Sequence, residues 1–319
     1  AIRRGVAYLV GGPVGGRRGV YQTSLKVMAL QSVDPVAYQR QIAEGARYLM
    51  RVQEGSGGWS YSGPGTTDNS NSQFAVLGLN AAALSGVAVP DAVWQKARNY
   101  YRVGQNRDGG WGYRPGSTNS YGSMTAAGVA SLYICDMWLH ISSGECGVYA
   151  DDRAVQVGLG WLARNFSVAT NPRHRSWKFY YLYALERAGV ILARRYFGRI
   201  DWYRQGVEHL AGQPPGALFT HSGSEWPFLK KCFALLFLAK GNAPILIHKA
   251  QWSGKWDTYR YDARFLVEYV GRRLDQPLDW QILPLSAPLD LLMAAPILYI
   301  NGTGGVGWTP DEIRRLKEY

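Results

Sequence analysis

Along the first 240 residues, stretches with a polar face alternate with stretches that contain almost no charge. The runs FAVLGLNAAAL (74–84) and AAGVASLYICDMWL (126–139) hold one charged residue between them, Asp136. A helix that is apolar on all sides is surrounded by protein, whereas an amphipathic helix faces solvent on one side. The pattern therefore predicts an inner layer of charge-free helices and an outer layer of amphipathic ones.

The apolar periodicity and the helix-start signals give the extent of these helices. Pro35 and Pro90 stand where the first turn of a helix accepts proline, which places helix starts at Asp34 and Asp91. We expect about five helical hairpins, built from helices at 1–10, 21–33, 34–53, 74–84, 91–105, 126–139, 151–162, 177–192, 202–213 and 232–241.

Two of the connecting loops repeat the same residues. The segments QEGSGGW (53–59) and QNRDGGW (105–111) start 52 residues apart, which is near the period of a helix-pair repeat. A glutamine at a helix end can satisfy unpaired carbonyls, and a glycine pair permits the turn that folds the Trp ring back on the helix. We assign this structural role to Gln53, Gly57, Trp59, Gln105, Gly109 and Trp111.

These repeats resemble the QW motifs of the terpenoid cyclase and protein prenyltransferase superfamily. The resemblance implies a mainly α fold, an α/α toroid with inner and outer helix rings around a central cavity. The order of the later segments is similar to large bacterial proteins in which a squalene-cyclase-like repeat region precedes a flavodoxin-like α/β domain, DUF4159. It implies a fold and a bacterial source, but no particular reaction.

After residue 242 the composition changes. The segment APILIHKAQW (243–252) is interpreted as an extended connection, and helix-like and strand-like runs then alternate up to Tyr319. Thr309 with Pro310 and Glu312 predicts the start of a last helix. We therefore expect a toroid at 1–242 and the first part of an α/β domain at 243–319.

The net charge of +12 is concentrated. Residues 151–200 carry nine Lys and Arg against three acids, among them Arg173, Arg175 and Arg199. Such a face can attract an acidic partner, but scattered arginines on amphipathic helices are more typical of a solvated surface, so we do not expect nucleic-acid binding. No charge-free run long enough for a transmembrane segment is evident. The chain begins with Ala1 and not with methionine, which indicates a processed or partial chain and leaves a periplasmic or a cytoplasmic location open.

The sequence does not contain the catalytic or metal-binding motifs that are known in this superfamily. The nearest counterpart of an Asp-x-Asp-Asp acid is Tyr149-Ala150-Asp151-Asp152, where we expect a helix start instead. Cys135, Asp136 and His140 do not share one helix face as zinc ligands would, and we expect no metal and no cofactor.

The loops that enter the inner helices hold polar residues beside aromatic rings, the composition of a ligand pocket. The alternative is that Asp68 and Asn119 cap helices while the rings fill the core. We favour a binding module for an apolar, isoprenoid or glycan-like ligand or a protein segment; an isoprenoid-processing enzyme with Asp68 or Glu225 as its acid and a scaffold with a basic face are the alternatives. The candidate cavity residues are Asn69, Asn71, Gln73, Asn119, Tyr121, His174, Arg175, Trp177, Tyr180 and Trp226.

Overall fold

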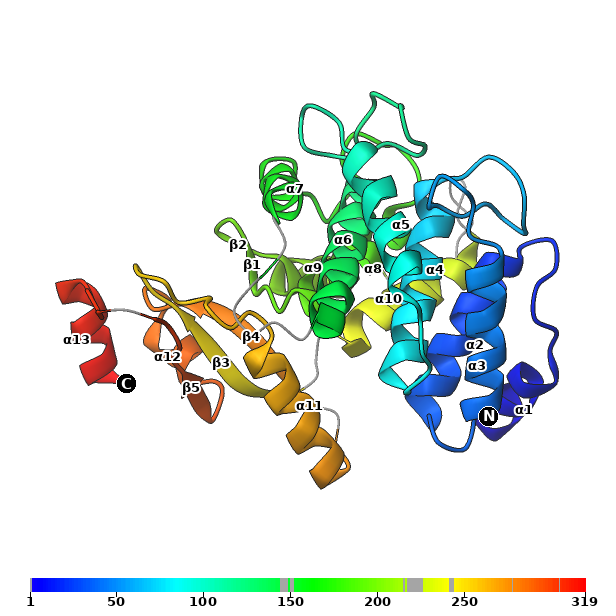
Figure 1. Ribbon diagram of the computed structural model, residues 1–319. Helices are drawn as coiled ribbons and strands as arrows, with labels where there is room; N and C mark the ends of the chain where they lie inside the picture. Colours follow the sequence, from blue (N-terminus) through cyan, green and yellow to red (C-terminus); the bar gives the residue numbers. More distant parts are fainter. Residues whose placement is uncertain are drawn as a thin grey trace. The chain divides into compact units, whose positions relative to one another are not determined.

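The computed structural model describes residues 2–143, 149, 152–214, 216, 226–240, 244–276, 278–303 and 305–319. These residues form thirteen α-helices and five short strands, so the fold is mainly α, as predicted (Figure 1). The chain divides into two compact units. The helical unit comprises 1–144, 150–166 and 172–174, and the mixed unit comprises 145–149, 167–171 and 175–319. The predicted domain boundary at 242 lies outside the described residues.

The helical unit is an array of helix pairs. Its elements are α1 (Ile2–Gly11), α2 (Gly19–Val33), α3 (Gln39–Arg51), α4 (Asn69–Leu84), α5 (Asp91–Val103), α6 (Gly122–Ser143) and α7 (Arg153–Arg164).

Two layers of helices build this unit. In one layer α4 packs between α2 and α6, and in the other α3, α5 and α7 pack against these helices from outside. All but the last two residues of α4 are buried, whereas α3 and α5 bury one face each. The alternation of charge-free and amphipathic stretches therefore corresponds to two layers.

Helix α6 is the one helix of the described chain that is long and apolar enough to cross a membrane. Its candidate stretch is Gly122–Ile141, and in the 18-residue window that qualifies it 72% of the residues are buried inside the structure. A core helix of this fold has the same properties, so this finding is compatible with a chain without a transmembrane segment.

Four helix starts differ from the prediction by four or five residues. Helix α6 begins at Gly122 and not at residue 126, α10 begins at Pro227 and not at residue 232, and the starts of α3 and α4 differ as well. Asp34 does not begin a helix: its carboxylate accepts the backbone N–H groups of Val36 and Ala37 in a turn, and α3 begins only at Gln39. Helix α4 begins five residues earlier than predicted, because the Asp68 side chain caps it and Asn69 to Gln73 continue the helix with polar side chains.

The mixed unit joins three helices to a small α/β layer. Its elements are α8 (Lys178–Ile191), β1 (Tyr196–Phe197), β2 (Ile200–Asp201), α9 (Trp202–Ala211), α10 (Pro227–Lys240), β3 (Ile245–Gln251), α11 (Asp262–Leu274), β4 (Asp279–Pro284), α12 (Leu289–Leu292), β5 (Ile297–Tyr299) and α13 (Pro310–Glu318).

The larger sheet has the order β4-β3-β5, with both pairings parallel. On one face, Ile247 packs with Ala263 and Val267 of α11. On the other face, Leu283 packs with Leu292 of α12, and Leu316 of α13 packs against the cluster around Ala250. Helices thus cover both faces, and the chain crosses from β4 over β3 to reach β5.

The segment interpreted as an extended connection is the central strand of this sheet. Strand β3 carries His248 and Lys249, which are 1% and 0% exposed. These two polar residues make the buried strand hard to recognise in the sequence, because their partners, the Leu292 carbonyl for His248 and two carboxylates for Lys249, come from elsewhere in the chain.

Candidate functional site

The two QW loops have the same geometry. The amide of Gln53 donates to the carbonyls of Gly57 and Val93, each at 3.0 Å. The amide of Gln105 donates at 2.9 Å to the carbonyls of Gly109 and Ala154. Because Val93 and Ala154 lie in the first turns of α5 and α7, each glutamine ties its loop to the outer helix of the next repeat.

The roles expected of Gln and Trp differ from those observed. It is the Trp indole that satisfies a carbonyl near a helix end: Trp59 Nε1 donates to Leu49 at 2.7 Å, and Trp111 Nε1 donates to Tyr101 at 2.8 Å. The last carbonyls of a helix have no intrahelical partner, and a ring folded back by the Gly pair reaches them. The glutamine acts between repeats instead.

Directly after the first QW loop, Asp68 caps α4. Its Oδ1 accepts the backbone N–H of Asn71 and its Oδ2 accepts the side-chain amide of the same residue, both at 2.8 Å. The side chain of Asn69 donates to the Gly112 carbonyl at 2.8 Å and so links α4 to the second QW loop. The capping role offered as the alternative for Asp68 is therefore present. Asn71 Oδ1 is buried and has no hydrogen-bond partner among the described residues.

Tyrosines surround this carboxylate. Tyr21 donates to Ser70 Oγ at 2.7 Å, and the hydroxyls of Tyr61 and Tyr113 lie 3.2 Å apart. The rings of Tyr21 and Tyr61 are 5.7 Å apart, and Tyr121 stacks on His174 at 4.6 Å. We call Tyr21, Tyr61, Tyr113 and Tyr121 the tyrosine wall. None of the four rings is fully buried, and Tyr61 is 42% exposed.

Electrostatics mark Asp68 as the centre of this group. Burial raises the pKa of Asp68, although hydrogen bonds from Asn71, Ser70 and Tyr113 act against the rise. Burial also raises the pKa of Tyr113 and of Tyr121, and the charge of Asp68 adds to the rise for both. Tyr113 and Tyr121 are thus phenols that ionise less readily than usual, beside one carboxyl group that is protonated more readily than usual.

The other predicted cavity residues lie in several environments. Gln73 is fully buried, Asn119 is exposed three residues before α6 begins, and His174 is half-buried against Tyr121. Arg175, Trp177, Tyr180 and Trp226 belong to the mixed unit, where Tyr180 is buried beside Phe233 and Trp226 is 67% exposed. Glu225 lies outside the described residues. Contact of these side chains with a ligand stays a prediction.

Sequence reasoning did not assign Tyr21, Tyr61 or Tyr113 to the candidate cavity. A signal was available for two of them, because Tyr61 and Tyr113 each stand two residues after the Trp of a QW motif. Tyr21 joins them through packing of α2 on α4, which no local pattern reveals.

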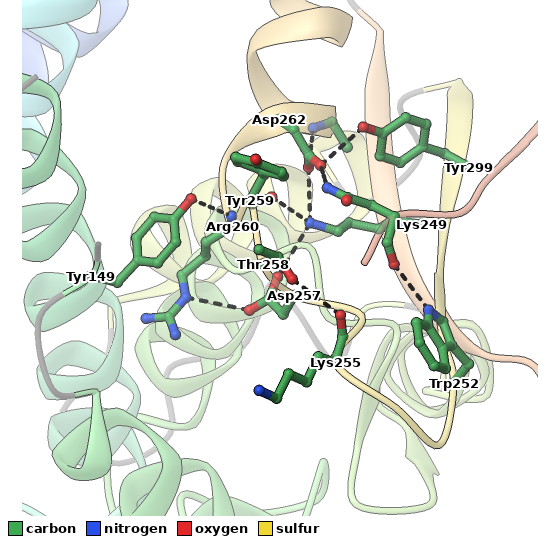
Figure 2. A network of polar contacts seen from close by, with 12 residues as sticks. Tyr149, Lys249, Trp252, Lys255, Asp257, Thr258, Tyr259, Arg260, Asp262 and Tyr299 are labelled. Atoms are coloured by element: carbon green, nitrogen blue, oxygen red, sulfur yellow. Dashed lines mark hydrogen bonds and ion pairs between the residues drawn. The ribbon is translucent and has the colours of Figure 1, made fainter. Parts of the chain in front are cut away.

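The mixed unit holds a second group of polar residues, at the carboxyl end of β3 (Figure 2). Lys249 Nζ donates to Asp257 Oδ1 at 3.2 Å, to the Tyr259 carbonyl at 2.7 Å and to Asp262 Oδ1 at 2.8 Å. Asp262 Oδ2 accepts Tyr299 from β5 at 3.0 Å and also accepts the Asn301 amide. The lysine therefore holds two carboxylates, and through them the loops that follow β3 and β5.

Several of the basic residues at 151–200 are paired within their own unit. Arg173 contacts Asp108 at 2.9 Å, Arg195 contacts Asp201 at 2.6 Å, and Arg187 pairs with Glu186. These pairs lower the charge that the region offers to an acidic partner. Within the described part of the chain, no group of three His, Cys, Asp or Glu side chains is placed to hold a metal ion.

Comparison with models of known protein families gave no match, and comparison with curated proteins gave none.

Proposed function

We propose that the helical unit is part of an α/α toroid and acts as a binding module, with the tyrosine wall around Asp68 as its contact surface. The resemblance of the QW loops supports the toroid, and so does the packing of α2, α4 and α6 as an inner layer. The parallel order β4-β3-β5 supports a flavodoxin-like layer after residue 242.

One observation carries the binding role: four tyrosines that are not fully buried gather around a carboxyl group, and a buried acceptor beside it, Asn71 Oδ1, lacks a protein partner. Half-buried phenols offer both an apolar face and a hydroxyl, and buried polar atoms are normally hydrogen-bonded. An uncharged ligand with apolar surface, of isoprenoid or glycan type, fits this wall better than an anion, because an anion would lie beside Asp68.

Native mass spectrometry with two probes tests this proposal. Farnesol represents the isoprenoid class and cellohexaose the glycan class. We expect the protein to retain one of them and to lose it when Tyr61 and Tyr113 are both changed to Leu. Tyr269→Leu, at an exposed tyrosine of α11, is the matched control and should bind like the parent chain. Failure to bind either probe, or equal binding by the double variant, would refute the role of the wall.

An isoprenoid-processing enzyme is the second candidate, and the raised pKa of Asp68 favours it. Asp68→Asn separates the two, because Asn caps helices as well as Asp but supplies no acid. If farnesol or a longer polyprene is converted by the parent chain and only bound by this variant, Asp68 is the acid. If both bind and neither converts, the protein is a binding module.

A further inference from the structure

The loops that carry the tyrosine wall are tied to the inner helices in the same way in successive repeats. Figure 1 shows both QW loops at the same end of the helical unit. The carbonyl of Tyr61 accepts the backbone N–H of Val20 in α2 at 3.0 Å. One repeat later, the carbonyl of Tyr113 accepts the backbone N–H of Asn69 in α4 at 2.9 Å. Each tyrosine is thus held by its own backbone at the start of an inner helix, so little ordering is needed when a ligand binds.

The row of aromatic rings continues into a third repeat. The backbone N–H of Gly122, the first residue of α6, donates to the Pro172 carbonyl at 2.9 Å. Two residues further on, His174 stacks on Tyr121 at 4.6 Å. Because packed helices lie about 8–10 Å apart, rings at the starts of α2, α4 and α6 extend over about 16–20 Å. A row of this length suits an extended ligand of several linked units.

The hydroxyl protons of the wall point inward. Tyr113 donates to the Asp68 carboxyl, so its oxygen accepts the proton of Tyr61 across their 3.2 Å contact. Tyr21 donates to Ser70 Oγ at 2.7 Å. The Tyr61 oxygen, on the most exposed ring of the wall, therefore presents lone pairs and not a proton to an incoming ligand.

A second acceptor lies beside Asp68. Asn71 is 0% exposed, and its side-chain amide donates to Asp68 Oδ2 at 2.8 Å. Its Oδ1 has no donor among the described residues. Since buried polar atoms are normally hydrogen-bonded, this oxygen and that of Tyr61 both favour a ligand that brings donors. Such a ligand carries several O–H groups.

The other side chains of the two loops favour a polar ligand as well. The segments 60–68 and 112–121 contain Tyr, Ser, Thr, Asn, Asp and Arg besides Gly and Pro, and no Val, Leu, Ile, Met or Phe. A hydrocarbon lying there would cover hydroxyl and amide groups without hydrogen-bonding to them, which is unfavourable. A sugar offers an apolar C–H face to a tyrosine ring and O–H groups to the acceptors at its edge.

We propose that the tyrosine wall binds an uncharged oligosaccharide, whose sugar rings lie along the row and whose hydroxyl groups donate to the Tyr61 oxygen. This inference rests on the binding role proposed above and decides between the two ligand classes named there. A charged sugar acid is disfavoured, because its carboxylate would lie beside that of Asp68.

Isothermal titration of the full chain with cellohexaose tests the ligand class. Farnesol represents the isoprenoids, and hexagalacturonate represents the sugar acids. We expect cellohexaose to bind, and cellobiose to bind at least about tenfold more weakly, because the disaccharide covers a shorter part of the row. Fully O-methylated cellohexaose should not bind, since it keeps the sugar rings but has no O–H donor.

Tyr61→Phe separates the oxygen from the ring. We expect this variant to bind cellohexaose about three- to tenfold more weakly than the parent chain, which is the effect of one lost hydrogen bond. Tyr8→Phe is the matched control, because Tyr8 is 80% exposed on α1 of the same unit, and it should bind like the parent chain. Circular dichroism confirms that each variant is folded before the titration.

The outcomes distinguish this inference from the proposed function. If farnesol binds and cellohexaose does not, the oligosaccharide is wrong, whereas the wall stays a binding surface. If hexagalacturonate binds more tightly than cellohexaose, the ligand is not an uncharged sugar. Equal binding of the O-methylated sugar, or unchanged affinity of Tyr61→Phe, overturns the role of the donors. If no probe binds, the proposed function fails together with this inference.

Discussion

The hydroxyl groups of Tyr61 and Tyr113 lie 3.2 Å apart, although the two residues are 52 positions apart in the chain. Each follows the Trp of a QW motif by two residues, so the contact joins equivalent positions of successive repeats. The same repeat that stacks the helices thus places its tyrosines side by side near Asp68. In the next contact along the wall, Tyr121 follows the second QW loop directly before α6, whereas its partner His174 lies before α8, in a segment without a QW loop.

The link between repeats depends on the QW glutamines. Gln105→Ala removes the bonds to Gly109 and Ala154, and we expect it to lower the free energy of unfolding by about 1–3 kcal/mol, because two carbonyls lose a donor. Gln95→Ala is the control: Gln95 is exposed on α5 and donates only to Asn99. Urea unfolding followed by tryptophan fluorescence measures both. Equal midpoints for the two variants would show that the glutamine does not join the repeats.

The first glycine of the Gly pair in each QW motif is required by geometry. Gly57 has φ +93°, and a Cβ there would lie 2.1 Å from the Lys96 carbonyl of α5. Gly57→Ala should therefore destabilise the helical unit by at least about 2 kcal/mol, since backbone must move to relieve the contact. Gly55→Ala, in the same loop with open space around it, should have little effect. Thermal melting of the two variants gives the comparison.

The sequence predicts the QW loops well and the polar networks poorly, for a physical reason. Gln53, Gly57 and Trp59 act through local turns, so their spacing carries their role even where the donor assigned to the helix end was wrong. Lys249 gives no such signal. Its partners Asp257 and Asp262 follow β3, whereas Tyr299 arrives from β5, and only the parallel pairing of β3 with β5 unites them. The contact of Ser253 with the Glu312 carboxylate spans 59 residues, and no local sequence pattern predicts it either.

Breaking the Lys249 pair should be costly. Lys249→Met leaves Asp257 and Asp262 without their buried cation, and we expect a loss of about 3–5 kcal/mol in unfolding free energy. Adding Asp262→Asn should recover part of this loss, because one uncompensated charge disappears. Lys317→Met, on the exposed side of α13, serves as the control for the substitution itself. Calorimetric unfolding compares Lys249→Met, the double variant and the Lys317→Met control. If Lys249→Met is as stable as the control, Lys249 contributes no net stability.

Asp279, the first residue of β4, should make the mixed unit less stable at neutral pH. Burial raises the pKa of Asp279 to about 6, and the Glu186 charge adds to the rise, against the hydrogen bond from Trp280 and the charges of Arg264 and Arg187. The folded state then holds this proton more tightly than the unfolded state, so stability falls as the pH rises from about 4 to about 6. Asp279→Asn cannot ionise and should be more stable than the parent chain at pH 7, by about 1–3 kcal/mol, with no difference near pH 4.

Calorimetry between pH 4 and pH 7.5 tests this sign. The melting temperatures of Asp279→Asn and of the parent chain should separate as the pH rises from about 4 to about 6, and the gap should then stay constant. Asp290→Asn, at an exposed position of α12, should follow the parent chain throughout. A gap that is already present at pH 4 would mean that the substitution acts through something other than the charge of Asp279. A parent chain that is the more stable at pH 7 would mean that Arg264 and Arg187 stabilise the ionised form of Asp279, so that the pairing with these arginines outweighs burial.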